Sequence, residues 1–263
     1  MKQTWNIALA QLPCREGDKE ANLREIEQAI EEAYTQGADI LVLPEIILTG
    51  FVHRETLRKL AESRNGESLS RIQRKLSAFP LYLVYSFPEL GEDDAVYNTT
   101  CFLGKDGTPL AYYRKTHLFA GEKKVTKPGD ELVHVEVDGA KIGLLVCFDI
   151  EFPEAARALA ARGIHMLLVP SANMSPYEVP HRTFTMARAM ENHMFVAYCN
   201  RIGAHKSFVY RGQSVVVDPE GKIVLECADS EREVRTVQID LADIEKSKTA
   251  YNYLAERRPE LYG

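Results

Sequence analysis

Cysteine is scarce in this sequence of 263 residues, and its arrangement argues against two kinds of site. There are five cysteines, an odd number, and no two of them form a C-x-x-C pair. A disulfide framework normally uses an even number, and a thiolate zinc site uses closely spaced pairs. We therefore expect reduced thiols, no disulfide, no metal and a reducing compartment. The five positions are Cys14, Cys101, Cys147, Cys199 and Cys227.

Long hydrophobic runs are also missing. No stretch approaches the roughly 20 apolar residues that cross a bilayer. The apolar segment within the opening MKQTWNIALAQLP is too short for the core of a signal peptide. The sequence therefore predicts a cytoplasmic protein with no membrane partner.

Positive charge is not in excess. Lys and Arg number 32 against 38 Asp and Glu, which gives a formal net charge of −6, and there is no dense basic run. Nucleic-acid binding is therefore not expected. With 45% hydrophobic and 27% charged residues, no internal repeat and no linker, the chain is predicted to form one globular domain over 1–263 that folds without a cofactor.

What is present is an alternation of strand and helix patterns. The chain opens with a strand at NIALAQL, a helix capped by Asp18 and stopped by Gly37, and a buried strand at DILVLPEI. An Asp138-Gly139 turn predicts a hairpin, and Pro153 is suited to begin a helix. The order predicts an α/β fold with mixed sheets. The remaining expected helices are 54–63, 68–78, 154–163 and 181–193, and the remaining strands are 81–87, 98–104, 110–118, 132–137, 140–146, 164–170, 195–201, 234–240 and a hairpin within 214–226.

Three chemically reactive side chains lie at the ends of apolar strands. Glu45 ends LVLPE, Lys115 lies near the end of LAYYRKTHL, and Cys147 ends GLLVC. In α/β folds sites form at such edges, because loops converge there above rigid strands. The sequence therefore favours one site that contains all three residues.

These segments resemble three motifs of the nitrilase, or carbon-nitrogen hydrolase, superfamily. LVLPEIILTGF is similar to its glutamate motif, YYRKTHLF to its lysine motif and GLLVCFDIEFPEAAR to its cysteine motif, in the same order. ARAMENHMFVAYCNRIG and GQSVVVDPEGKIV resemble its C-terminal half. The resemblance covers nearly the whole chain and implies a four-layer αββα sandwich.

The resemblance also implies the chemistry. Cys147 would be the nucleophile, Glu45 would take its proton, and Lys115 with the Phe148 backbone N–H would stabilise the oxyanion. Ammonia would leave, and Glu45 would then activate water to hydrolyse the thioester. Glu122, in HLFAGEKK, lies where family members often carry a second glutamate, although a solvent-exposed loop residue is an equal alternative.

Taken alone, each of these residues has a simpler explanation. Cys147 after an apolar run would more often be a packed core thiol, and a lysine at a strand end is usually solvated. Because three motifs occur together and in order, we favour catalytic roles for these residues over core packing and solvation. Asp149 and Arg157 are expected to support the turn or to form a surface ion pair. The other four cysteines are expected to be structural, and no histidine has a flanking pattern that favours a cysteine-histidine hydrolase; His117, His181 and His193 are the ones considered.

The predicted activity is hydrolysis of a small linear amide to a carboxylate and ammonia, with amide and water as partners and no cofactor. N-carbamoyl hydrolysis and ω-amidase activity stay open, and a non-catalytic scaffold of the same fold is the alternative from another class. A true nitrilase is disfavoured, because those chains typically have Trp-Glu after the cysteine, whereas this one has Phe-Asp. The resemblance also implies a homodimer or higher even oligomer, with 241–263 as a tail in subunit contacts.

Glu151 raises a question about substrate choice. In CFDIEFPE it occupies the position where the ω-amidase branch commonly has arginine. If it faces the pocket, an anionic substrate tail would meet like charge, and neutral or amine-bearing amides would be preferred. If instead it pairs with an arginine of a neighbouring helix, it never contacts substrate.

Overall fold

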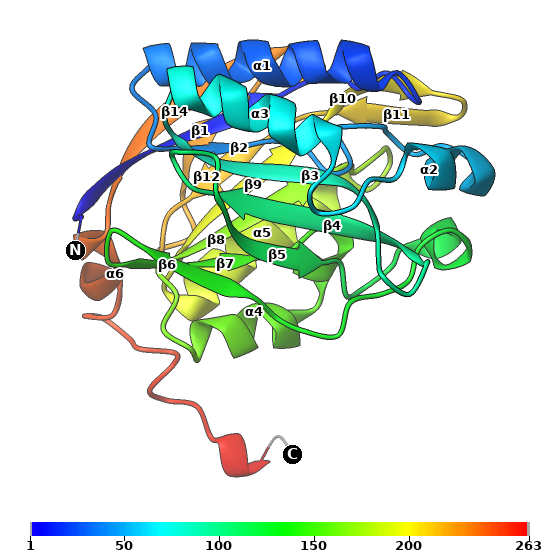
Figure 1. The fold of residues 1–263 in the computed structure, drawn as a ribbon. Helices are drawn as coiled ribbons and strands as arrows, with labels where there is room; N and C mark the ends of the chain where they lie inside the picture. The colour runs from blue at the N-terminus through cyan, green and yellow to red at the C-terminus, as the bar shows by residue number, and fades with distance from the viewer. Residues whose placement is uncertain (1, 262–263) are drawn as a thin grey trace.

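The computed structural model describes residues 2–261, and its centre is a pair of six-stranded sheets (Figure 1). The first has the order β14-β1-β2-β3-β4-β5 and the second β13-β12-β9-β8-β7-β6, with β10-β11 as a separate hairpin. The strands of the first sheet are β1 (Thr4–Gln11), β2 (Ile40–Val42), β3 (Tyr82–Leu90), β4 (Val96–Leu103), β5 (Pro109–Arg114) and β14 (Glu233–Asp240). Those of the second are β6 (His134–Val137), β7 (Ala140–Leu144), β8 (Met166–Ser171), β9 (Phe195–Asn200), β12 (Val215–Val217) and β13 (Ile223–Glu226), and the hairpin is β10 (Ile202–His205) with β11 (Phe208–Arg211).

Helices cover the outer faces of both sheets (Figure 1). On the first sheet lie α1 and α3, and on the second lie α4 and α5. The helices are α1 (Lys19–Thr35), α2 (Arg54–Leu60), α3 (Glu67–Ala78), α4 (Pro153–Ala160), α5 (Glu178–Asn192) and α6 (Ala242–Ser247), with 3₁₀ helices η1 (Ala120–Lys124), η2 (Cys147–Glu151) and η3 (Pro259–Leu261).

The alternation within β1 shows how one strand serves two layers. Ile7 and Leu9 point into the core between the sheets, whereas Ala8 and Ala10 pack under the outer helices. Across the inter-sheet core, β1 faces β9, and β2 and β3 face β8. The layers are therefore helix, sheet, sheet, helix, and the predicted αββα sandwich is confirmed.

Local signals placed several elements correctly. Asp18 caps α1, because its carboxylate accepts a hydrogen bond of 3.0 Å from the Ala21 N–H. Asp138 and Gly139 both have positive φ, which the tight turn between β6 and β7 requires. Pro153 is the first residue of α4, as predicted.

Three parts of the sheet system differ from the sequence prediction. The strand expected over 39–46 is only β2, because Pro44 cannot donate to a ladder and Ile46 has a φ of 46°. The strand expected over 110–118 ends at Arg114. The hairpin β10-β11 was not predicted, because its exposed residues show no apolar alternation.

The C-terminal segment leaves the body of the molecule after α6 (Figure 1). Of the tail predicted over 241–263, residues 262–263 lie outside the described part. Among residues 2–261 there is no helix long and apolar enough to cross a bilayer.

Candidate active site

The three strand-end residues converge at one cavity of about 630 Å³. Glu45 and Lys115 are each 1% exposed and Cys147 is 8% exposed, so they form its buried end. Its walls are largely apolar and its outer charged residues are basic. The cavity is lined by Glu45, Phe51, Val52, His53, Arg54, Lys115, Phe119, Ala120, Gly121, Glu122, Lys124, Val125, Cys147, Ala172, Met174, His205, Lys206, Phe208 and Tyr210.

Lys115 lies between two carboxylates. Its Nζ donates hydrogen bonds of 2.7 Å to Glu45 Oε1 and 2.7 Å to Glu122 Oε2. Burial disfavours the ammonium, but the two carboxylates outweigh this effect and raise the pKa of Lys115 well above its usual value. Lys115 is therefore a fixed cation next to Cys147.

Glu45 is held by groups from both sheets. The Ala172 N–H, just past β8, donates to Glu45 Oε2 at 2.9 Å, and Asn98 Nδ2 of β4 donates to Oε1 at 2.7 Å. The Glu45 N–H donates in turn to the Ser171 carbonyl at 3.2 Å. Burial raises the pKa of Glu45, and Lys115 acts in the opposite direction. A carboxyl with a raised pKa is suited to accept and return a proton.

Glu122 belongs to the same cluster. It is 8% exposed, and its Oε2 accepts 2.7 Å hydrogen bonds from both Lys115 Nζ and the Phe119 N–H. Asn98 bridges the two carboxylates, since its Nδ2 also lies 3.3 Å from Glu122 Oε1. Glu122 is therefore a buried neighbour of Lys115 rather than a solvated loop residue.

Cys147 begins η2 with a φ of 48°, an unusual conformation for a residue with a side chain. The strained position directs the thiol into the cavity at the end of the second sheet. Burial raises the pKa of Cys147, Glu45 raises it further, and Lys115 lowers it. The resting residue is therefore a neutral thiol next to a carboxylate. The Phe148 N–H is among the first amides of η2 and has no acceptor within that helix.

Asp149 fixes the turn, the first of the two alternatives that the sequence left open, and it does not form a surface ion pair. It is fully buried and accepts hydrogen bonds from the Val146 N–H at 2.9 Å, the Tyr113 hydroxyl at 2.7 Å and the His117 N–H at 2.8 Å. These contacts join the cysteine turn to the segment that carries Lys115. The Arg157 side chain donates at 2.8 Å to the Glu191 carbonyl, so it joins α4 to α5.

Glu151 does not line the cavity. Its carboxylate lies 3.1 Å from His181 Nε2, behind the cysteine turn. Glu151 therefore does not face the pocket, as direct selection of substrate charge would require. Its partner is His181 instead of the arginine that the sequence suggested. Arg188 of α5 contacts the same turn, but it donates to the Ile150 and Glu151 carbonyls at 3.0 Å each.

Sequence reasoning missed several residues around the site. Asn98, Ser171 and Arg188 are polar residues that are almost fully buried. Their signal is a polar residue inside an otherwise apolar strand or helix face, which is costly unless it is hydrogen-bonded. That signal indicates a need for partners without indicating which partners. Among the described residues, no cluster of three or more His, Cys, Asp or Glu side chains is arranged to hold a metal.

Comparison with known proteins places this geometry in context. Residues 6–249 match the model of the carbon-nitrogen hydrolase family. An (R)-stereoselective amidase of a Pseudomonas species is 38% identical, covering 98% of this chain and 93% of the relative. A 2-oxoglutaramate amidase of Bacillus subtilis is 30% identical, covering 98% and 99%.

A solved structure gives the same fold together with a chemical result. A mutant of the amidase from Nesterenkonia sp. AN1, with the acetamide moiety of fluoroacetamide covalently added at the active-site cysteine, superposes with a TM-score of 0.87 at 32% identity. The match covers 98% of this chain and 95% of that one.

Proposed function

This chain belongs to the carbon-nitrogen hydrolase family, and on that premise we propose that Cys147, Glu45 and Lys115 are its catalytic residues. The protein is a thiol-dependent enzyme of the amidase-like branch and hydrolyses linear amides. One observation carries the assignment of residues. A thiol, a carboxylate of raised pKa and a fixed ammonium share the buried end of one cavity.

The proposed reaction has two halves. Cys147 gives its proton to Glu45 as Sγ attacks the amide carbon, and Lys115 with the Phe148 N–H stabilises the oxyanion. When the C–N bond breaks, Glu45 returns the proton to the leaving nitrogen and a thioester remains. Glu45 then removes a proton from water, which attacks the thioester. The C–S bond breaks, Glu45 returns that proton to the sulfur, and the acid leaves and ionises to the carboxylate. Glu122 keeps Lys115 oriented and charged throughout.

The assignment of Cys147 is tested by the variant Cys147→Ala. We expect ammonia release from a small amide to vanish while the melting temperature changes little, because truncation removes one sulfur atom at the cavity surface. In the wild-type enzyme, acid-quenched mass spectrometry is expected to find the acyl group on the Cys147 peptide. Near wild-type turnover by the variant, or an adduct on another cysteine, would show that the nucleophile lies elsewhere.

The charges at the mouth of the cavity do not favour the neutral or amine-bearing amides that Glu151 suggested. The acids that line the cavity, Glu45 and Glu122, are both at its buried end. Apart from Lys115 at the buried end, the remaining Lys, Arg and His residues of the lining are His53, Arg54, Lys124, His205 and Lys206, and no further Asp or Glu lines the cavity. In a protein of net charge −6, this asymmetry favours an acyl chain that ends in an anion.

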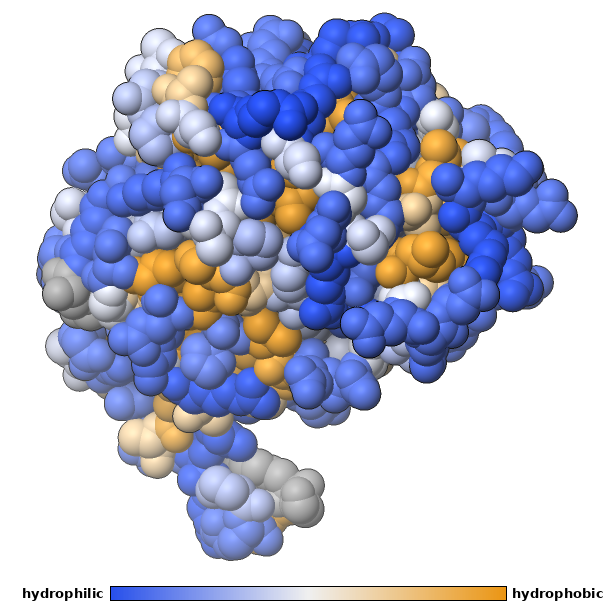
Figure 2. All heavy atoms as spheres, viewed as in Figure 1, coloured by the Kyte–Doolittle hydropathy of each residue, from blue (hydrophilic) through white to orange (hydrophobic). Residues whose placement is uncertain are grey.

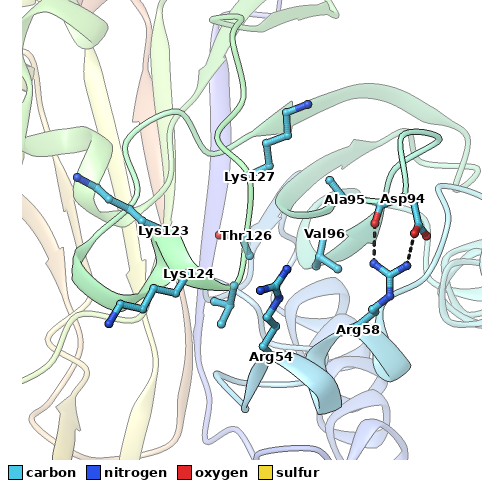
Figure 3. Close-up of a pocket in the computed structure, with 10 residues that line it drawn as sticks. Arg54, Arg58, Asp94, Ala95, Val96, Lys123, Lys124, Thr126 and Lys127 are labelled. Atoms are coloured by element: carbon cyan, nitrogen blue, oxygen red, sulfur yellow. Dashed lines mark hydrogen bonds and ion pairs between the residues drawn. The ribbon is translucent and has the colours of Figure 1, made fainter.

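The basic character continues into a neighbouring hollow of about 490 Å³ that shares Arg54 and Lys124 with the cavity (Figure 3). There Arg58 pairs with Asp94, while Arg54 and Lys124 lie away from that acid. Figure 2 shows apolar side chains in a recess below α2, ringed by hydrophilic residues. We therefore favour ω-amides with a free carboxylate over neutral or amine-bearing amides.

Specificity constants test this substrate class. We expect glutaramate to be hydrolysed faster than size-matched hexanamide and 5-aminopentanamide. Lys124→Gln and Arg54→Gln are each expected to lower kcat/KM for glutaramate about threefold while leaving hexanamide unchanged, since exposed charge pairs are individually weak. Lys59→Gln, an exposed lysine outside the cavity lining, is the control. A preference for hexanamide would refute the substrate class without affecting the amidase assignment.

We also propose that the chain forms one catalytic domain over 1–263, assembles as a homodimer or higher even oligomer, and works in the cytoplasm. The family match over 6–249 supports the single domain, and the five buried free thiols support a reducing compartment. The exposed apolar side chains of the C-terminal segment, Tyr251 and Leu261, support the oligomer.

A further inference from the structure

A line of hydrogen-bonded side chains leads from Ser171, close to Cys147, away from the substrate cavity. Ser171, at the end of β8, lies next to Cys147, where a hydrogen bond from its hydroxyl would lower the pKa of the thiol. Its hydroxyl donates to Tyr198 Oη at 2.8 Å, and Tyr198 Oη lies 3.1 Å from His181 Nδ1. His181 Nε2 lies 3.1 Å from Glu151 Oε1. We call Ser171, Tyr198, His181 and Glu151 the rear chain.

The inner members of the rear chain have almost no access to water. Ser171 is 0% exposed, and Tyr198 and His181 are each 4% exposed. Buried polar groups must satisfy one another, so the proton positions of neighbouring members are coupled. Glu151 is only half-buried and connects the chain to solvent.

The donor and acceptor roles follow from Glu151 inward. Burial lowers the pKa of His181 to about 4, so near neutral pH the ring has a single N–H. An ionised carboxylate only accepts, which places that N–H on Nε2 and leaves the Nδ1 lone pair to accept from Tyr198. The Tyr198 hydroxyl then donates its only proton to His181, so its oxygen can only accept a hydrogen bond from Ser171. This direction agrees with the Ser171-to-Tyr198 donation.

The Ser171 hydroxyl has one proton for two neighbours. While it points to Tyr198 it cannot donate to the Cys147 sulfur, and an anionic sulfur there lacks one hydrogen bond. A hydrogen bond to an ionised group is stronger than one between neutral groups, so the missing donation favours the neutral thiol.

We propose that Glu151, His181 and Tyr198 are positioning residues that hold the Ser171 proton away from Cys147 and keep the sulfur protonated until Glu45 takes its proton. When the thiolate forms, Ser171 rotates its O–H from Tyr198 to Sγ and no bond other than hydrogen bonds changes. The function assigned to the rear chain rests on the proposed nucleophilic role of Cys147. The hydrogen bonds within the rear chain do not depend on that role.

Other charged groups surround the two ends of the chain. At the inner end, Cys147 faces Glu45 and Lys115. At the outer end, β8 contributes no charged residue to the packing against η2. The charged or titratable residues of the two helices packed there are Glu178, His181, Arg182, Arg188 and Glu191 of α5 and Glu154 and Arg157 of α4. The test must therefore separate an effect through the chain from a change in nearby charge.

The test measures thiol ionisation directly, without substrate. The purified enzyme is treated with methyl methanethiosulfonate over a range of pH, and modification of the Cys147 peptide is followed by mass spectrometry. Tyr198→Phe keeps the ring but removes the hydroxyl, which frees the Ser171 proton for the sulfur. We expect Cys147 to react about tenfold faster at a given pH below its ionisation midpoint, the effect of one hydrogen bond to a charged group.

Glu151→Leu tests the outer end. Without the carboxylate, the His181 proton is free to move to Nδ1. Tyr198 then donates its hydroxyl proton to Ser171, and Ser171 donates to the Cys147 sulfur. We therefore again expect faster modification of Cys147. The double variant with Tyr198→Phe should react no faster than Tyr198→Phe alone. The charge control Glu154→Gln should match the wild type.

Two outcomes would overturn the proposal. One is an unchanged pH profile in Tyr198→Phe with a normal melting curve. The other is a Glu151→Leu acceleration that persists in the Tyr198→Phe background, which would show a through-space charge effect. Ser171→Ala provides a second check, because Tyr198→Phe should have no effect when added to it. Turnover by Cys147→Ala would refute the proposed nucleophile and would leave these modification rates informative.

Discussion

At the scale of single residues, the charge balance around Cys147 decides its resting state. Lys115 contributes one positive charge, and it is shared by Glu45 and Glu122 at 2.7 Å each. A thiolate added to this cluster would be a third anion against one cation, which is unfavourable in a buried site. Cys147 is therefore expected to ionise only as Glu45 accepts its proton.

Replacing Lys115 with Gln is expected to lower kcat by about 100-fold or more, since one oxyanion donor contributes that much and the carboxylates also lose their counter-ion. Ammonia release measures the effect. Lys123→Gln changes an exposed lysine of η1 and should retain activity. A rate within a few-fold of wild type in Lys115→Gln would exclude the oxyanion role.

The raised pKa of Glu45 sets the acid side of the pH profile. The base must be deprotonated, so kcat/KM should rise with pH and level off above the Glu45 pKa. Because burial raises this pKa above its ordinary 4.5, the half-point of the rise should lie above pH 4.5. A profile measured with a neutral amide checks this, and an acid half-point at or below 4.5 would contradict it.

At the scale of elements, η2 is held by side chains from segments on both sides. Asp149 joins it to the loop after β5, and Arg188 of α5 donates to its last two carbonyls. The turn keeps Cys147 at positive φ. Backbone strain of this kind persists only where the surroundings over-determine it.

Asp149→Asn is expected to destabilise the fold by about 2–4 kcal/mol, because an amide nitrogen would face buried donors that now share a carboxylate. Urea unfolding measures the free energy, and activity should fall together with stability because the nucleophile turn is displaced. Glu154→Gln, on the exposed first turn of α4, is the matched control. An equally stable Asp149→Asn variant would show that the turn does not depend on this carboxylate.

At the scale of the whole molecule, the C-terminal segment extends away from the sandwich and contacts it through Tyr253, whose N–H donates to His193 Nε2, and through Leu254. It leaves the body after α6, and Tyr251 and Leu261 are 55% and 64% exposed (Figure 1). Large apolar side chains on an extended segment favour burial against a second subunit. The proposed oligomer contact of this tail follows from that exposure.

Removal of residues 249–263 is expected to shift the enzyme toward monomers in sedimentation velocity experiments. Tyr34→Ser, which removes an exposed aromatic side chain from α1, should leave the distribution unchanged. A truncated chain with the wild-type distribution would place the subunit contact on another surface.

The sequence by itself determined the order of elements and the positions of the reactive residues at the ends of strands. Those features depend on short-range physics: alternation in β1, the cap at Asp18, the turn at Asp138-Gly139, and strand ends at Lys115 and Cys147. Each can be evaluated within about ten residues of chain. The three motifs then indicated a shared site and its chemistry.

Only the tertiary structure decided which groups surround the reactive residues. Packing of the two sheets brings Ala172 and Asn98 to Glu45, buries Glu122 against Lys115, and turns Glu151 toward His181. These contacts join residues far apart in the chain, and no local pattern encodes such partners. Their side-chain directions are set by how the layers pack, because a buried polar group takes whichever partner the packing brings within reach.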